Sequence, residues 1–402
     1  MALMPVADAM AAILAGADAL PEEMVALEAA YHRVLARDIA ALRTQPPEPM
    51  SAMDGYAVRT ADATLGARLR VIGEIAAGRP FDRALAAGEA LRIFTGGVLP
   101  AGADGIVIQE DTARDGDIVT INEAAALGKH IRPAGVDFRE GDVLLRAGTR
   151  LTDRDLALAA GMNHPALPVR RRPIVAVLAT GDELVLPGAT PGPGQIVLSN
   201  GFALRALARA EGAEVIDLGI AVDTLAATTS AIQRAIDLGA DVLVTTGGAS
   251  VGDHDLVKQS LEAAGVEMAF WRIAMRPGKP MMHGRRQAMR VVGLPGNPVS
   301  SYVCGFLFMV PLLRALSGRI DITHARESAV LGRDLAANDQ REDYLRTRLV
   351  PRDDGVLVAT PVLKQDSSLL GNLAVAEGLL IRLPFAPAAK AGDACQVIRL
   401  PV

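Results

Sequence analysis

The chain has few cysteines and few aromatic residues. Its 402 residues include two cysteines, Cys304 and Cys395, which stand in dissimilar contexts and form no CxxC pair. This argues against a disulfide framework and against a zinc site built from cysteines. No histidine pair has metal-ligand spacing such as HExxH, and no GxSxG, Walker A or complete GxGxxG motif in a βα unit occurs. Hydrolase triads and dinucleotide binding therefore lose support.

The chain also lacks an excess of positive charge and a long apolar run. Its formal charge of -5 argues against nucleic acid as a partner, because phosphate neutralisation needs a basic surface. The most apolar segment, residues 302–313, is shorter than the roughly 20 residues of a membrane span and contains Pro311. The first ten residues have no basic region before an apolar stretch, so they do not predict a signal peptide. We expect a cytoplasmic protein without a membrane partner.

What is present is enough apolar sequence for a large core, arranged in contrasting regions. Half of the residues are hydrophobic, and a chain of this length predicts two to four domains at roughly 150 residues each. Residues 5–40 have the pattern of two helices. Residues 58–150 contain short strand-like runs punctuated by glycine, which indicate a β-rich module. The last ~85 residues alternate in the same way and predict a small β-barrel or an open β-domain.

Between these regions, buried strand patterns alternate with amphipathic helix patterns. Residues 173–184 begin with a continuous apolar run, which is typical of a strand buried on both faces. Helices and strands then alternate up to residue 317. This order predicts a doubly wound α/β domain with a mostly parallel sheet.

Three polar turns follow strands of this predicted sheet, at residues 180–183, 246–255 and 294–301. Ligands of open α/β sheets bind outside the carboxyl ends of the strands, where all three turns should meet. Glycines in the turns would let the backbone approach a phosphate closely. Carboxylates could hold Mg²⁺ through oxygen or water, and the candidates are Asp182, Glu183, Asp253 and Asp255.

A plainer interpretation exists for each of these motifs alone. Asp182 and Glu183 could cap a helix, and Gly247 with Gly248 could only turn the chain. The occurrence of three such turns at one sheet edge favours a binding site instead. The sequence of residues 276–280, Arg-Pro-Gly-Lys-Pro, places two cations around a rigid turn that could hold one anion. Its plainer interpretation is a solvated loop with two ordinary surface cations.

An ordered series of motifs resembles the molybdopterin molybdenumtransferase family, whose eukaryotic relatives include the gephyrin C-terminal region. The resemblance covers nearly the whole chain. It begins with the sequence SAMDGYA at residues 51–57 and FTGG at residues 94–97. It continues through the motifs at residues 100–104, 131–137, 180–184, 247–255, 275–280 and 294–300.

The resemblance implies a multidomain fold with a central α/β domain. By this resemblance, residues 1–45 and 140–169 form an elongated N-terminal subdomain of helices and strands. Residues 46–139 form a β-rich subdomain inserted into it. Residues 170–317 form the molybdopterin-binding α/β domain, and residues 318–402 form a C-terminal β-barrel. The family is typically a homodimer whose active cleft uses both subunits.

The resemblance also implies roles for individual residues. The residues implied to be catalytic are Asp54, Asp137, Asp182, Glu183 and Asp255. Of these, Asp182, Glu183 and Asp255 would hold Mg²⁺. Residues implied to contact the substrate are Thr95, Asp223, Gly247, Gly248, Ser250, Arg276, Lys279, Pro295, Pro298, Ser300, Arg346 and Ser367. Arg276 stands where lysine is common in the family, and a guanidinium group is not an isosteric substitute for an ammonium group.

The implied reaction inserts molybdate into adenylylated molybdopterin, with Mg²⁺-dependent cleavage of a phosphoanhydride and release of AMP. Implied partners are a second copy of the chain and, transiently, molybdopterin adenylyltransferase and molybdoenzyme chaperones. A rival enzyme is that adenylyltransferase itself, or a related pyrophosphate-cleaving enzyme, because the α/β domain alone also resembles it. SAMDGYA and FTGG, absent from single-domain versions, argue against that rival. A gephyrin-like scaffold is the remaining alternative.

Overall fold

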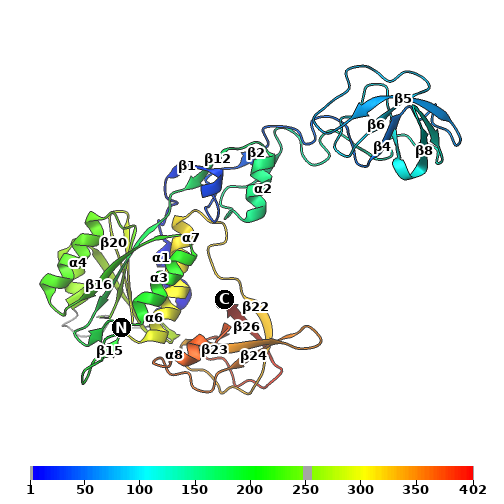
Figure 1. Cartoon of the computed structure of the whole chain (residues 1–402). Helices are drawn as coiled ribbons and strands as arrows, with labels where there is room; N and C mark the ends of the chain where they lie inside the picture. The colour runs from blue at the N-terminus through cyan, green and yellow to red at the C-terminus, as the bar shows by residue number, and fades with distance from the viewer. Residues whose placement is uncertain (1–2, 248–255, 402) are drawn as a thin grey trace.

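The computed structural model describes residues 3–247 and 256–401, and it shows an extended chain of structural units (Figure 1). An α/β domain and a β-barrel lie side by side at one end. A narrow arm leads from them to a separate β-sheet unit at the other end. The predicted multidomain fold class, α/β with β-rich parts, is confirmed.

The arm is built from strand pairs that join segments far apart in the sequence. β1 (Glu22–Ala26) pairs antiparallel with β12 (Ala166–Arg170), and β2 (Ile39–Ala40) pairs with β11 (Val143–Leu145). Helix α2 (Asp153–Gly161) packs beside them and is capped by the Thr152 hydroxyl.

The second of the two helices predicted within residues 5–40 is wrong. Residues 22–40 form β1, the short 3-10 helix η1 (Leu27–Ala29) and β2. Apolar side chains of this segment, such as Leu35, pack against Leu167 and Val169 of the returning strand. This tertiary pairing outweighs the helix propensity of the segment.

The first predicted helix exists as α1 (Val6–Leu14), but it does not belong to the arm. Its Ala9 and Ile13 are fully buried in the core of the α/β domain, and α1 contacts α7 (Val310–Leu316) of that domain. The chain therefore starts on the α/β domain and leaves it for the arm. It returns to the α/β domain after β12.

The unit at the far end of the arm is a mixed six-stranded sheet of order β7-β4-β6-β5-β9-β8. Four of these strands match the predicted strand-like runs, namely β5, β6, β7 and β9. The strands are β4 (Gly55–Val58), β5 (Arg68–Ile75), β6 (Glu89–Ile93), β7 (Gly105–Ile108), β8 (Thr112–Asp115) and β9 (Ile118–Ile121). At its base, β3 (Met50–Ser51) pairs with β10 (Ile131–Arg132), and the 3-10 helix η2 (Gln109–Asp111) follows β7.

The α/β domain contains a six-stranded sheet of order β16-β13-β17-β21-β20-β18. Its first four strands are parallel, as predicted, whereas the hairpin of β18 and β20 was not predicted. The bounds are β13 (Ile174–Thr180), β16 (Glu214–Ala221), β17 (Val242–Thr246), β18 (Glu267–Arg272), β20 (Pro280–Arg286) and β21 (Met289–Leu294). A short pair, β14 (Leu184–Val185) and β15 (Ile196–Val197), projects from the edge.

Helices cover both faces of this sheet, because alternate strand residues enter two separate cores. Val175 and Val177 of β13 pack with the helices α1, α3 (Asn200–Ala210), α6 and α7. Ala176 and Leu178 pack with α4 (Leu225–Asp237) and α5 (Leu256–Ala263) on the opposite face. The doubly wound arrangement follows from this burial on both faces.

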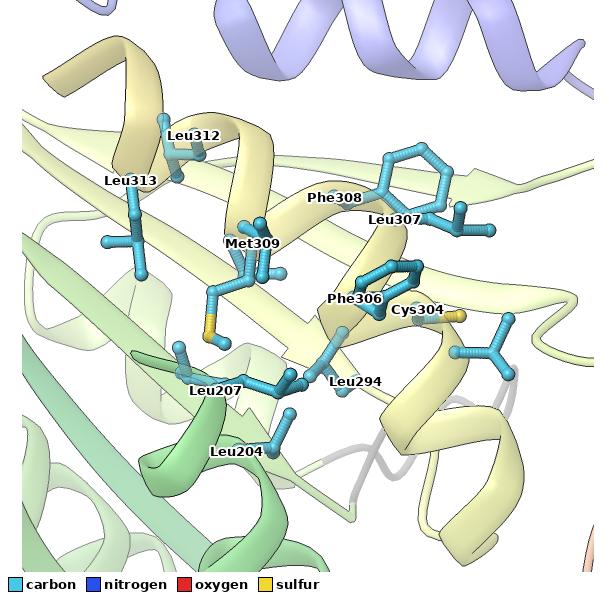
Figure 2. Close-up of a cluster of buried hydrophobic side chains, with 14 of the residues drawn as sticks. Leu204, Leu207, Leu294, Cys304, Phe306, Leu307, Phe308, Met309, Leu312 and Leu313 are labelled. Carbon is cyan, nitrogen blue, oxygen red and sulfur yellow. The ribbon is translucent and has the colours of Figure 1, made fainter. Parts of the chain in front are cut away.

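The helix that contains the most apolar segment is longer than residues 302–313. It runs as α6 (Pro298–Cys304), one π-helical stretch (Gly305–Met309) and α7 (Val310–Leu316). The π-helical stretch lies just before Pro311, which cannot donate the usual backbone hydrogen bond. The whole helix, residues 298–316, has 19 residues and the length and composition of a membrane span. However, 83% of its most apolar part is buried inside the protein. Figure 2 shows Met309 beside Leu207 and Phe306 beside Leu294, and all of these side chains belong to one buried cluster, as expected of a core helix.

The C-terminal domain is a closed barrel, which decides between the two predicted forms. Strand β23 pairs with both β24 and β25, so the sheet closes on itself. The bounds are β22 (Glu327–Leu331), β23 (Glu342–Pro351), β24 (Leu357–Pro361), β25 (Gly378–Arg382), β26 (Ala394–Arg399) and helix α8 (Leu370–Ala374). A two-residue strand of the α/β domain, β19 (Met275–Arg276), adds to β23 in parallel and joins the two domains.

Candidate functional site

A cavity of about 980 Å³ opens at the carboxyl ends of β13, β17 and β21. Thr180, Thr246 and Pro295 mark these three strand ends in its lining. The predicted meeting of the polar turns at one sheet edge is therefore found. Six of the predicted site residues line the cavity, namely Glu183, Asp223, Gly247, Pro295, Pro298 and Ser300.

Asp182 is hydrogen-bonded to Asp223, which lines the cavity. The backbone N–H of Asp223 donates a hydrogen bond of 2.9 Å to Asp182 Oδ1, and the N–H of Asp182 donates one of 3.4 Å to Asp223 Oδ2. The two residues follow β13 and β16, which end side by side because Thr180 pairs with Ala221. This reciprocal bonding brings two exposed carboxylates together beside Glu183.

The turn after β17 comes very close to the turn after β13. Gly247 has a φ of +91°, and a Cβ built on it would lie 2.5 Å from the backbone oxygen of Thr180. A larger residue at this position would clash with backbone, so glycine is required for both conformation and space. The remainder of this turn contains four predicted residues that lie outside the described part of the chain, namely Gly248, Ser250, Asp253 and Asp255.

The described residues alone do not form a three-ligand metal site. No group of three or more His, Cys, Asp or Glu side chains suited to a metal occurs among residues 3–247 and 256–401. Asp182, Glu183 and Asp223 supply hard oxygen atoms at the cavity, and such atoms are the ligands that Mg²⁺ prefers.

The two cations of the 276–280 loop have different environments. Pro280, which follows Lys279, lines the cavity, and Lys279 itself is exposed. Arg276, by contrast, forms a bidentate ion pair with Asp343 of the barrel, in which Nε donates to Oδ1 at 2.9 Å and Nη2 donates to Oδ2. The loop therefore touches the cavity at one end and the barrel at the other.

The barrel contributes a wall of the cavity through residues 366–370. The carbonyl oxygen of Ser367 accepts a hydrogen bond of 3.0 Å from the N–H of Val299, and its hydroxyl accepts one of 3.2 Å from Asn297 Nδ2. Ser368 and Leu370 line the cavity directly. Predicted residue Ser367 therefore lies at the site.

Predicted residue Arg346 supports this wall from within the barrel. Its side chain is almost completely buried, and its Nη2 donates a hydrogen bond of 3.1 Å to the carbonyl oxygen of Asp366. Burial lowers the pKa of Arg346 to about 10, which still leaves the guanidinium group charged near neutral pH. Its Nε is buried without a hydrogen-bond partner in the described structure. Arg346 therefore places a buried positive charge behind the 366–370 segment.

Asp54 and Thr95 lie in the unit beyond the arm, away from the cavity. Asp54 precedes β4 and Thr95 follows β6, both of which lie at the far end of the molecule from the α/β domain (Figure 1). Asp54 Oδ1 accepts hydrogen bonds of 2.8 Å from the backbone N–H and from the hydroxyl of Thr95. These bonds, the backbone one first, lower the pKa of Asp54. Asp137 lies exposed after β10, near the base of the same unit.

Within one chain the two groups of predicted residues do not meet. One group surrounds the cavity of the α/β domain, and the other group, Asp54, Thr95 and Asp137, lies along the far part of the extended molecule. A site that contains both groups requires a second copy of the chain.

Sequence reasoning missed two asparagines at the cavity. Asn200 opens α3, and its Nδ2 donates a hydrogen bond of 2.7 Å to the carbonyl oxygen of Gly296. Asn297 holds Ser367, as described above. Both asparagines line the cavity. The position of Asn200 directly after Ser199 and before an amphipathic run is a helix-start pattern that could have revealed it.

Family sequence models match three successive parts of the chain. Residues 4–162 match the MoeA N-terminal region (domain I and II). Residues 176–315 match a probable molybdopterin binding domain, and residues 328–400 match the MoeA C-terminal region (domain IV).

Relatives and solved structures agree with these matches. The molybdopterin molybdenumtransferase of Bacillus subtilis is 35% identical over 368 residues, which are 89% of this chain and 85% of the relative. That of Haemophilus influenzae is 38% identical and covers 74% and 73% of the two chains. A crystal structure of a molybdopterin biosynthesis MoeA protein from Pyrococcus horikoshii covers all of both chains at 30% identity, with a TM-score of 0.85. The chain therefore belongs to the molybdopterin molybdenumtransferase family of molybdenum cofactor biosynthesis.

Proposed function

We propose that this protein inserts molybdate into adenylylated molybdopterin, with Mg²⁺-dependent cleavage of the phosphoanhydride and release of AMP. The observation that carries the proposal is the cavity at the sheet edge, which has carboxylates on one side and the 276–280 loop on another. A nucleotide anhydride and an oxyanion require different protein groups. The anhydride requires carboxylates that hold a metal ion, and the oxyanion requires a cationic side chain. Carboxylates at the cavity would hold the metal, and Lys279, next to Pro280 of the lining, would supply the positive charge.

Asp182 and Glu183 are the described residues that would hold the magnesium ion, and Asp255 is the third member by family resemblance. Mg²⁺ commonly uses one or two protein carboxylates together with water and substrate phosphates, so a pair of carboxylates fits this ion. When bound, the ion neutralises the charge that develops between the phosphates during cleavage. Asp223 keeps the Asp182 carboxylate in place by donating its backbone N–H to Oδ1.

Lys279 and Ser300 would receive the molybdate. Lys279 is exposed next to a residue of the cavity lining, and Ser300 is buried within that lining. An ammonium group attracts a tetrahedral dianion, and a hydroxyl group donates a hydrogen bond to one of its oxygens. A molybdate oxygen, or water, attacks the phosphorus atom of the molybdopterin phosphate, its bond to the bridging oxygen breaks, and AMP leaves with that oxygen. The two thiol sulfurs of the dithiolene form bonds to the molybdenum, and one oxo ligand leaves as water with the two thiol protons.

The complete site would form between two copies of the chain. Asp54 is ionised and firmly bonded to Thr95, yet it lies far from the cavity of its own chain. A symmetric dimer can place the end of one arm over the cavity of the other subunit, because each copy then supplies the same missing part. Asp54 or Asp137 of one subunit would position the substrate or relay a proton in the cavity of the other.

Mixed dimers test this arrangement. We expect Asp54→Asn and Asp182→Asn each to reduce molybdate-dependent AMP release by about a hundredfold, as for lost groups that act in the transition state. After subunit exchange between the two variants, activity should return to about a quarter of wild type. The reason is that about half of the molecules become mixed dimers with one intact site.

A matched control is the mixture of Asp182→Asn with Glu183→Gln. These residues belong to the same half-site, so every site in the mixed dimer keeps one defect and no activity returns. If the Asp54 and Asp182 variants exchange subunits and AMP release does not recover, the proposal of a site shared between two subunits is wrong. Incubation with molybdopterin and ATP checks the rival adenylyltransferase, since this protein should form no adenylylated product.

A further inference from the structure

The ion pair between Arg276 and Asp343 joins the 276–280 loop to the barrel. Both nitrogen–oxygen contacts are made, and the Asp343 side chain is only 7% exposed. Such a bidentate geometry between a guanidinium and a carboxylate is specific as well as strong. The backbone joins the same two residues, since Arg276 and Asp343 are partners in the pairing of β19 with β23.

Other polar groups of the barrel complete the environment of Arg276. Its Nη2 also donates a hydrogen bond of 3.2 Å to Asn338 Oδ1, while Asn338 Nδ2 donates to carbonyl oxygens within the barrel. Asp339 lies 3.7 Å from Arg276 and pairs with Arg341. The four charges of Arg276, Arg341, Asp339 and Asp343 cancel. An oxyanion placed on Arg276 would therefore meet two carboxylates.

Lys279 differs from Arg276 in this respect. It is exposed, and within the described residues its ammonium group has no hydrogen bond or ion pair. The loop that carries it is closed by a hydrogen bond of 2.8 Å from the N–H of Ile273 to the carbonyl oxygen of Lys279. The backbone of the loop is thus held, and the Lys279 side chain is left available.

From this geometry we infer that Arg276 is a positioning residue, which holds the barrel wall of the cavity in place through Asp343, and that Lys279 alone of the two binds the oxyanion. The inference rests on the proposed function for the oxyanion part. The barrel wall is the 366–370 segment, whose Ser367 bonds to Val299 and whose Ser368 and Leu370 line the cavity. If the ion pair opens, the barrel loses its bidentate side-chain link to the 276–280 loop, and the hydrogen bonds of Ser367 and the β19–β23 pairing remain.

The first readout is hydrogen exchange of the Val299 amide in the full-length protein, because this amide donates to Ser367 across the domain boundary. Asp343→Asn leaves Arg276 in place but removes its partner, and we expect exchange to become roughly tenfold faster through local opening. Arg276→Ala should have the same effect, and Arg276→Asp combined with Asp343→Arg should reverse it. Arg399→Ala is the matched control, since it removes an ion pair between two residues of the barrel domain, Arg399 and Glu327. It should leave the exchange rate of the Val299 amide unchanged.

The second readout is the half-saturating molybdate concentration for AMP release. Lys279→Ala should raise it at least about tenfold while leaving Val299 exchange unchanged. Asp343→Asn should raise it through the loosened wall, whereas an oxyanion-binding Arg276 would be freed from competition and would lower it. The positioning role is overturned if Asp343→Asn leaves exchange unchanged or lowers the molybdate requirement. If the wild type shows no molybdate-dependent turnover, the proposed function fails, and the exchange data still decide the role of Arg276.

Discussion

The two regions that carry predicted site residues differ in how they hold them. In the α/β domain, the residues stand on turns that are locked to one another by backbone contacts around a cavity. In the unit beyond the arm, Asp54 is fixed by Thr95 where β4 begins and β6 ends. The first region contains an open cavity. The second contains a carboxylate fixed by hydrogen bonds, outside that cavity. On the proposed function, each region supplies half of a site that forms between two copies of the chain.

The largest effect is expected where a site loop is part of the α/β core. Gly278 has a φ of +109°, and a Cβ built on it would lie 2.2 Å from Sγ of the buried Cys304. Gly278→Ala should therefore lower the free energy of unfolding by about 3 kcal/mol or more, through overpacking and backbone strain together. Urea denaturation of the full chain measures this loss.

A matched control for backbone strain alone is Gly355→Ala. Gly355 also has a positive φ, of +81°, but a Cβ there would have open space. We expect a loss of only about 1 kcal/mol. Equal losses at the two glycines would show that the 276–280 loop is not packed into the core, and the contrast between the two regions would weaken.

An intermediate effect is expected from His283 in β20 of the α/β domain. Its side chain is buried, and burial, with smaller effects of Arg290 and Arg285, lowers its pKa to about 4. Because the folded pKa lies below the unfolded value of about 6.5, the unfolded chain takes up the proton first as the pH falls. Stability should be complete above pH 6.5 and should decrease by about 2 kcal/mol towards pH 4.

The measurement is urea denaturation across this pH range for the wild type and His283→Gln. The variant should lose part of the acid sensitivity. It should keep the part due to His324, since burial lowers the pKa of that side chain to about 4 as well. An unchanged pH dependence in the variant would show that His283 is not the source.

The smallest effect on stability is expected at the exposed half-site. Thr95→Val removes the hydroxyl that donates to Asp54 and keeps the backbone N–H. The pKa of Asp54 should rise, because one hydrogen bond to its charged form is lost. The acid limb of the pH profile for AMP release should therefore move to higher pH, with almost no change in urea denaturation. A loss of stability comparable to that of Gly278→Ala would mean that this face is structural.

Much of the fold was predictable because its signals are local. The strands and helices of the α/β domain follow from hydrophobic periodicity, and alternation of the two predicted the doubly wound sheet. The helix predicted within residues 21–40 failed, because β1 is stabilised by β12, a partner distant in sequence. The hairpin of β18 and β20 was missed although the rigid turn at residues 276–280 lies in its connection, because the pairing adds an antiparallel edge to an otherwise parallel sheet.

The candidate site divides in the same way. The turns that contain Glu183, Gly247, Pro295, Pro298 and Ser300 were predictable because they follow strands whose carboxyl ends must meet in a parallel sheet, whereas Asp223 was implied by the family resemblance alone. The motif of Arg276 and Lys279 was visible too, but its two cations looked equivalent in the sequence. Asn338 and Asp343 gave no signal, as they act only through a residue in another domain.

By itself, the sequence determined which turns gather at the edge of the sheet and which residues enter the core, because periodicity along the chain reports backbone geometry and burial directly. Only the tertiary arrangement of the domains determined that Arg276 pairs with Asp343 and that Asp54 lies far from the cavity of its own chain. A charge acquires its partner only when folding brings another element within a few ångströms, and no local pattern records that distance.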